Sequence, residues 1–168
     1  YSSAASDVYK RQHADDPSPP GGRGSGGAAT AGDLMGLVEE LGTFVAAAST
    51  RFTVGTNLTF NFMPDEPNTA SALVESGGSA PEYVFGNDLP SWENQRVQVT
   101  CRSTSSTKAR ADAHAAWVAV QKIANESLSS VSWLRASALQ SPFLLRRDEA
   151  DRVLYAFNVS CTRRTTST

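Results

Sequence analysis

The first organised segment of the chain follows a helical pattern of hydrophobic positions. Its apolar residues recur at spacings of three and four, which places them on one face of an amphipathic helix ending near Ser49. Asp33 stands just before this pattern, where its side chain can cap the first turn. The apolar positions are Leu34, Leu37, Val38, Leu41, Phe44, Val45 and Ala48.

A second helix is predicted to start at the hydroxyl-rich run "STSST", residues 103–107, whose side chains can cap it. The many alanines in its apolar stripe indicate a close approach to the layer beneath. His114 lies beside the stripe, and we interpret it as a surface or boundary residue. The stripe consists of Ala109, Ala113, Ala116, Trp117, Val120, Ile123 and Ala124.

Alternation of apolar and polar residues with a period of two predicts strands. The clearest strand is 96–102, in which Val97, Val99 and Cys101 face one way. Residues 77–94 interrupt the pattern and are expected to form a long loop. The other predicted strands are 57–62, 69–76, 131–140 and 153–161.

The resulting order is α-β-β-β-α-β-β, and the last two strands are expected to form an antiparallel hairpin. We therefore predict an α+β fold with one mixed, mainly antiparallel sheet of four to five strands and two helices packed on one face. The other face is only half polar, which indicates an oligomer. Its expected apolar residues are Leu134, Ala138, Leu154 and Ala156.

The ends of the chain lack any such pattern. Residues 1–31 are rich in Pro, Gly and Ser and are expected to be a disordered leader, in which 1–12 resemble translated adapter or vector sequence. Because the chain begins with Tyr rather than Met, we interpret it as a fragment or a processed product. We expect one α+β domain over 32–164 and a disordered tail over 165–168.

Composition narrows the classes of function. The 168 residues carry 15 basic and 17 acidic side chains, a net charge of −2, which argues against a dedicated nucleic-acid binder. The apolar stretches are too short for a membrane helix. Cys101 and Cys161 fall on the apolar side of their strands, so we interpret them as core residues, with a disulfide between them as the alternative.

Candidate chemistry is scarce. A nucleophile needs a nearby base, and the predicted domain holds His114 alone as a histidine. Two distant cysteines and one histidine do not supply a zinc site. The carboxylates cluster in turns beside Pro or Arg, where solvated loop tips are the simplest interpretation. These observations favour a protein that is not an enzyme and has no cofactor or metal.

The segment between the last two strands is unusually charged. In "LLRRDEADR", three arginines surround three carboxylates. One interpretation is a soluble turn whose charges prevent edge-to-edge aggregation. The other is an interface element that pairs with complementary charges on a neighbouring subunit and specifies register.

Four blocks of sequence carry a resemblance to a known family. They are "DLMGLVEELGTFVA", "FMPDEPNTASALVESGGSAPE", "ENQRVQVTCRSTSSTKARADAHAAWV" and "ALQSPFLLRRDEADRVLYAFNVSCTRR", which together cover most of residues 33–164. The most specific is "ALQSPF" followed by "RDE" and an alternating strand. With these blocks the chain resembles the minor capsid and tail-terminator-like proteins of long-tailed bacteriophages.

The resemblance implies a structural virion protein at the head–tail junction, without catalytic residues or cofactor. Relatives of the tail-terminator type form a hexameric ring that caps the tail tube and joins it to the connector. The implied partners are further copies of the chain, the tail-tube protein and head-completion or connector proteins, assembled in the host cytoplasm. The shared segments, extended to Arg152 at the end of the charged turn, give the candidate interface residues. These are Pro64, Asp65, Glu66, Pro67, Ser141, Pro142, Phe143, Arg146, Arg147, Asp148, Glu149 and Arg152.

Two other functions remain as alternatives. A small ligand-binding or enzymatic α+β domain would use the aromatic loop with Tyr83, Phe85 and Trp92 to line a pocket. A nucleic-acid-binding domain would stack bases on sheet aromatics. Its candidate aromatics are Phe60, Phe62, Tyr155 and Phe157.

Overall fold

The computed structural model of the chain describes residues 36–83 and 90–164. Several expectations lie outside these residues. They are the disordered leader 1–31, the cap at Asp33, the apolar position Leu34, the loop residue Phe85 and the disordered tail 165–168.

Both helices form where the hydrophobic period predicts them. Helix α1 spans Leu37–Ala48 and buries most of its predicted apolar face, whereas Phe44 is half-buried and Ala48 is exposed. Helix α2 spans Ser106–Val120, and the Ser105 hydroxyl caps it by accepting a hydrogen bond from the Lys108 backbone N–H at 3.4 Å. The alanine stripe of α2 is buried against the sheet, and His114 is exposed as expected.

Seven strands form one mixed sheet in the order β1-β2-β3-β7-β5-β4, and β6 pairs with β7 off this path. The pair β1 and β2 is parallel, and every other pair is antiparallel. The strands are β1 Leu58–Phe60, β2 Ala70–Tyr83, β3 Pro90–Ser103, β4 Ala124–Leu128, β5 Val131–Ala138, β6 Phe143–Arg147 and β7 Val153–Arg164.

The α+β class, the mixed sheet and the antiparallel pairing of the last two predicted strands are confirmed, whereas the count of four to five strands is wrong. Strand β4 was missed because "ANESL" is polar and exposed and its first residue continues the alanine stripe of α2. Strand β6 was missed because "FLLRR" does not alternate. The observed order is α-β-β-β-α-β-β-β-β.

The long loop expected over 77–94 is also wrong, because β2 and β3 continue as paired strands as far as Tyr83 and Pro90. This part of β2 is exposed, so no buried face imposed an apolar alternation on it. A bulge between Glu75 and Gly78, with Gly77 at a φ of 94°, bends the strand. We call the paired segments 75–83 and 90–95 the arm.

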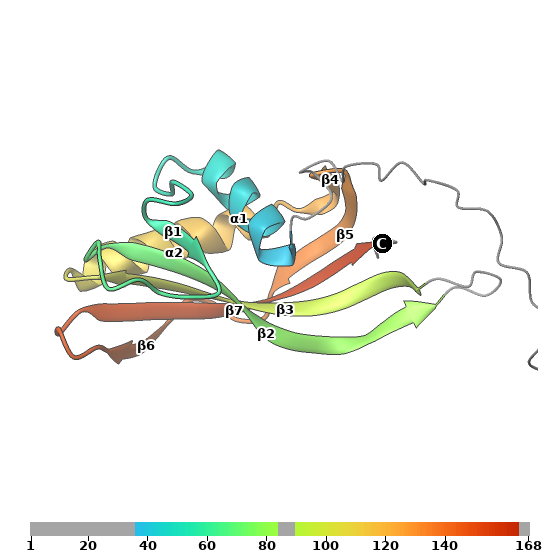
Figure 1. The fold of residues 1–168 in the computed structure, drawn as a ribbon. Coiled ribbons are helices and arrows are strands. Elements are labelled where there is room, and N and C mark those ends of the chain that lie inside the picture. The colour runs from blue at the N-terminus through green and yellow to red at the C-terminus, as the bar shows by residue number, and fades with distance from the viewer. Residues whose placement is uncertain (1–35, 84–89, 165–168) are drawn as a thin grey trace, which may run out of the picture. The chain divides into compact units, whose positions relative to one another are not determined.

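The two helices lie on one face of the sheet, as Figure 1 shows. They bury the inward side chains of the central strands, among them Leu73, Val99, Trp133 and Phe157. Gly42 lets α1 approach closely, because a Cβ at this position would collide with the ring of Phe60. The predicted packing of both helices on one face is therefore confirmed.

The opposite face differs from the expectation. Leu134 is exposed, but Leu154 and Ala156 are buried rather than exposed to solvent. Leu154 lies in a cleft of about 510 Å³ whose walls come from Met63 and from the charged turn after β6. Two loops therefore fold onto this face of the sheet, which sequence periodicity cannot reveal.

A buried carboxylate links α1 to the sheet. Glu40 accepts hydrogen bonds from Trp133 Nε1 at 2.7 Å and from Arg163 Nη1 at 3.1 Å. Arg163 also donates from Nε to Glu93 at 3.3 Å. Burial raises the pKa of Glu40, although the bonds from Trp133 and the charge of Arg163 oppose the shift.

Cys101 and Cys161 are both buried and both free, which confirms the interpretation as core residues. Cys101 pairs with Tyr155 across β3 and β7, whereas Cys161 pairs with Gln95. Six strand positions, roughly 20 Å, therefore separate the two thiols along the sheet. Burial raises the pKa of each thiol to about 12.

We expect both thiols to be unreactive in the folded protein. At about pH 8 the thiolate fraction at each is lower than in an unfolded chain on the order of a thousandfold. Titration with a thiol reagent should therefore give no fast signal in buffer and two equivalents in denaturant. One equivalent reacting rapidly without denaturant would contradict the burial of that cysteine.

Candidate functional site

The charged turn between β6 and β7 is held together by its own first residue. The Asp148 carboxylate accepts hydrogen bonds from the backbone N–H groups of Ala150 at 3.1 Å and Arg152 at 2.9 Å. The Asp148 carbonyl also accepts from the Asp151 N–H at 3.0 Å. Asp151 adopts a φ of 57°, which a short polar side chain tolerates in such a turn.

Arg152 connects this turn to the loop between β1 and β2. Its Nε donates to Asp148 Oδ2 at 2.7 Å, which closes a salt bridge within the turn. Its Nη1 donates to the Asp65 carbonyl at 2.5 Å and to Asn68 Oδ1 at 3.3 Å. Two segments more than eighty residues apart in sequence are thereby joined by one buried side chain.

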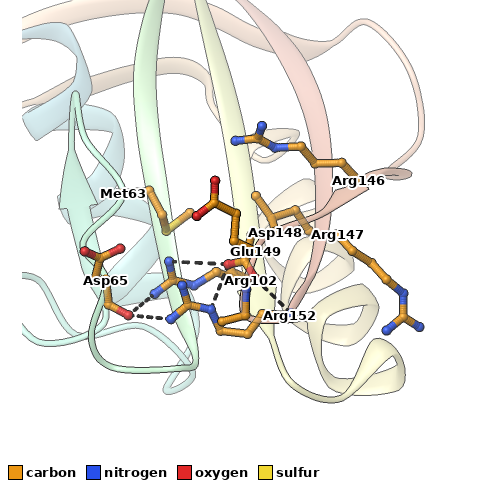
Figure 2. A pocket seen from close by; sticks show the side chains of 10 residues that line it. Met63, Asp65, Arg102, Arg146, Arg147, Asp148, Glu149 and Arg152 are labelled. Atoms are coloured by element: carbon orange, nitrogen blue, oxygen red, sulfur yellow. Dashed lines mark hydrogen bonds and ion pairs between the residues drawn. The ribbon is translucent and has the colours of Figure 1, made fainter.

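Arg102, near the end of β3, binds the same loop. Its Nη2 donates to the carbonyls of Pro64 at 2.6 Å, Asp65 at 2.9 Å and Pro67 at 2.9 Å. Only 3% of Arg102 is exposed. Figure 2 shows the guanidinium groups of Arg102 and Arg152 side by side, next to Asp65. We call Arg102, Asp148 and Arg152, with the loop carbonyls they bind, the arginine cluster.

In the arginine cluster, the guanidinium groups of Arg102 and Arg152 both lie close to the Asp148 carboxylate, and these contacts affect the pKa values of Arg102 and Asp148. Burial lowers the pKa of Arg102, and the neighbouring charge of Arg152 lowers it further. Burial alone would raise the pKa of Asp148, but hydrogen bonds and charge from Arg152 outweigh it and hold that pKa below its usual range. The interactions with Arg152 therefore favour the ionised form of Asp148.

The structure thus brings together two of the segments that the sequence singled out. Pro64–Pro67 and the turn at 148–152 meet at the cluster, but through bonds within one chain. Ser141 and Pro142 do not join them; they line a separate cavity of about 200 Å³ against His114 and Trp117 of α2.

Sequence reasoning missed Arg102, which is the residue that organises this region. The alternation in β3 places it on the same face as Arg96, and Arg96 is exposed. No feature of the strand distinguishes the two arginines. The Pro64–Pro67 loop itself offered one signal. Its backbone carbonyls are not paired in a strand, so they need hydrogen-bond donors from elsewhere in the chain.

The other predicted residues remain on the surface. The side chains of Glu66, Arg146, Arg147 and Glu149 are exposed. Arg147 pairs with Asp151 at 2.8 Å, and Figure 2 shows it pointing away from the cluster. Within the described part of the chain, the side chain of Arg146 forms no hydrogen bond or ion pair, although its backbone belongs to the β6–β7 pair.

Strand β6 exposes a run of apolar side chains beside Arg146. Leu144 is 57% exposed, and Leu139, Phe143 and Leu145 are exposed as well. One edge of β6 pairs with β7, and among the described strands no partner covers its other edge. We call Leu139, Phe143, Leu144, Leu145 and Arg146 the β6 patch. An uncovered apolar edge strand is typical of a protein that associates with other proteins.

Among the described residues, the aromatic side chains proposed for the alternative functions do not form the expected sites. Tyr83 is exposed on the arm, where Glu82 pairs with Trp92, and the cavities described above are lined by other residues. Phe157 is buried under the helices and Phe60 packs against the same core, which leaves no shared platform for stacked bases.

Within residues 36–83 and 90–164, no group of three His, Cys, Asp or Glu side chains is placed to hold a metal ion. The two helices described are too short or too polar to cross a membrane.

The fold and its exposed edge define a small α+β assembly protein. A family model described as "Bacteriophage tail terminator protein" matches residues 37–165. The chain therefore belongs to the bacteriophage tail terminator family, and the resemblance drawn from the sequence is confirmed. It is a structural protein of the phage tail junction.

Comparison with solved structures agrees on the fold. One similar structure is a chain from the "Virion of native gene transfer agent (GTA) particle", with a TM-score of 0.50 and 18% sequence identity. The alignment covers 74% of this chain and 95% of that chain. Among curated proteins, no sequence matches this one.

Proposed function

We propose that this chain is the subunit of a ring that caps the tail tube at the head–tail junction and joins it to the connector. Family membership over residues 37–165 is the observation that carries the proposal. The uncovered β6 patch supports it, because a ring subunit needs an exposed surface that another protein can cover.

The ring is a homo-oligomer, and we take six as its subunit number. Its partners are the tail-tube protein on one side and the head-completion or connector proteins on the other. Assembly takes place in the cytoplasm of the host bacterium, and the finished ring remains in the neck of the virion. The chain acts by surface complementarity, without catalysis and without a cofactor.

The test combines the isolated chain with the phage. Size-exclusion chromatography with light scattering should give the mass of six subunits, alone or in the presence of tail tubes. Electron microscopy of phage lacking this product should show abnormally long tails without heads. A chain that stays monomeric and leaves tail tubes unchanged, together with normal virions in its absence, would contradict the proposal.

A further inference from the structure

The β6 patch carries charge of one sign only. Strand β6 has no acidic residue, and its second half presents the side chain of Arg146, whereas the neighbouring Arg147 is paired with Asp151. Its first half presents Phe143 and Leu144, both exposed. A strand that binds along this edge therefore needs apolar side chains followed or preceded by carboxylates.

The outer half of β2 has the complementary composition. Within Ala70–Tyr83 the charged residues are Glu75 and Glu82, and there is no lysine or arginine. Strand β1 pairs only with Ser71–Leu73, and Asn61 Oδ1 accepts a hydrogen bond from the Glu75 N–H at 3.1 Å. Beyond Glu75, β3 is the only described strand beside β2. Tyr83, which is 65% exposed, supplies the apolar surface.

These two surfaces lie at opposite ends and on opposite edges of the sheet. Strand β6 pairs with the beginning of β7, at Val153–Ala156, whereas the arm lies beside the end of β7, at Arg164. Along β7 the separation is roughly 35 Å. Figure 1 shows β6 and the outer end of β2 on opposite sides of the domain.

We propose that the β6 patch of one subunit binds the outer half of β2 of the next copy of this chain, with Arg146 facing the carboxylate of Glu82 beside Tyr83. Two different surfaces at opposite ends of one subunit make a head-to-tail contact, and such contacts close into a ring when the rotation permits. The inference rests on the proposed ring and names the surfaces that build it.

The contact is made chiefly by side chains. The bulge at Gly77 and the missing N–H of Pro81 interrupt the free edge of β2, so a continuous ladder between subunits is excluded. Apolar burial of Tyr83 against Leu144 and Leu145 then supplies affinity, and the charges select the register. Pro81 and the bulge also protect the free arm from indiscriminate strand pairing.

A charge-swap experiment tests this contact. One variant carries Arg146→Glu, and the other carries Glu82→Lys; each change affects an exposed side chain. Each variant alone places like charges at every contact and should fall to monomers in light scattering. Mixed in equal amounts, the two should recover the wild-type mass, because every contact in an alternating ring is then complementary.

The control variant is Arg110→Glu on α2, an exposed arginine outside both surfaces, which should assemble like wild type. Circular dichroism of each variant verifies that it is folded. If the wild-type chain assembles only on tail tubes, the same variants are supplied to phage lacking the gene. The readout is then the number of tails of normal length: neither variant alone restores them, and co-expression does.

Other outcomes overturn the inference while leaving the proposed function intact. Normal rings from the Arg146→Glu variant that fail to complete tails would assign the β6 patch to another virion protein. Failure of the mixture to recover, with each variant folded, would show that the two surfaces do not meet. A wild-type chain that never forms rings would instead contradict the proposed function itself.

Discussion

Replacing Arg102 with alanine is expected to lower the free energy of unfolding by about 3–5 kcal/mol, the range found when one partner of a buried ion pair is removed. The guanidinium holds three carbonyls of the Pro64–Pro67 loop and is almost wholly buried. Without it, the loop loses its anchor on β3. Urea unfolding followed by tryptophan fluorescence measures the change.

Arg96 provides the matched control, because it lies on the same face of the same strand but is exposed. Arg96→Ala should change the free energy of unfolding by less than about 0.5 kcal/mol. Arg102→Lys should fall between the two, since an ammonium keeps the charge but lacks the planar fork. Equal effects of Arg96→Ala and Arg102→Ala would show that the loop is held without Arg102.

The second large effect is expected at Glu40. Glu40→Ala should lower the free energy of unfolding by about 3 kcal/mol, because it leaves the buried Trp133 N–H without an acceptor and removes a carboxylate from Arg163. Glu39, its neighbour in the first turn of α1, is the control, and Glu39→Ala should cost less than about 1 kcal/mol. Similar losses at both positions would contradict a special role for Glu40.

The pH dependence of a Glu40→Gln variant separates burial from hydrogen bonding. Burial raises the pKa of Glu40 in the folded state, so its contribution to stability is full below the unfolded pKa and is lost as the pH rises through the folded pKa. Glutamine does not ionise. The unfolding free energy of Glu40→Gln should therefore improve relative to wild type as the pH rises above about 4, the ordinary pKa of a glutamate. A shift in the opposite direction would mean that the bonds to Trp133 and Arg163 outweigh burial.

The elements that sequence patterns located are those with one buried face. The stripe of α1 and the alternation of Val97, Val99 and Cys101 reflect contact with the core, and each was placed correctly. Strand β4 and the outer halves of β2 and β3 gave no such signal. They are held by main-chain hydrogen bonds that any residue except proline can make, so exposure leaves their composition unconstrained.

The candidate site was located as two separate segments of sequence. The unusual density of charge at 146–152 and the paired prolines at 64–67 marked the two segments, but nothing in the sequence indicated that they contact each other. Only Arg102 and Arg152 join them, and neither carries a local feature that distinguishes it from an exposed arginine such as Arg96. In the fold, some charged residues of these segments form bonds within the cluster. Others, such as Arg146, stay on the surface, where a partner protein can contact them.

The sequence by itself determined the fold class, the two helices and their common face, the buried cysteines and the family. These depend on hydrophobic period and on short motifs, which are properties of neighbouring residues. The tertiary structure alone decided that a charged turn folds back onto a proline loop, that Arg102 is buried, and that β6 has an uncovered edge. Each of these features depends on contacts between segments that are distant in sequence. The free energy of burying a polar group there depends on its hydrogen-bond partners, which a local sequence pattern does not reveal.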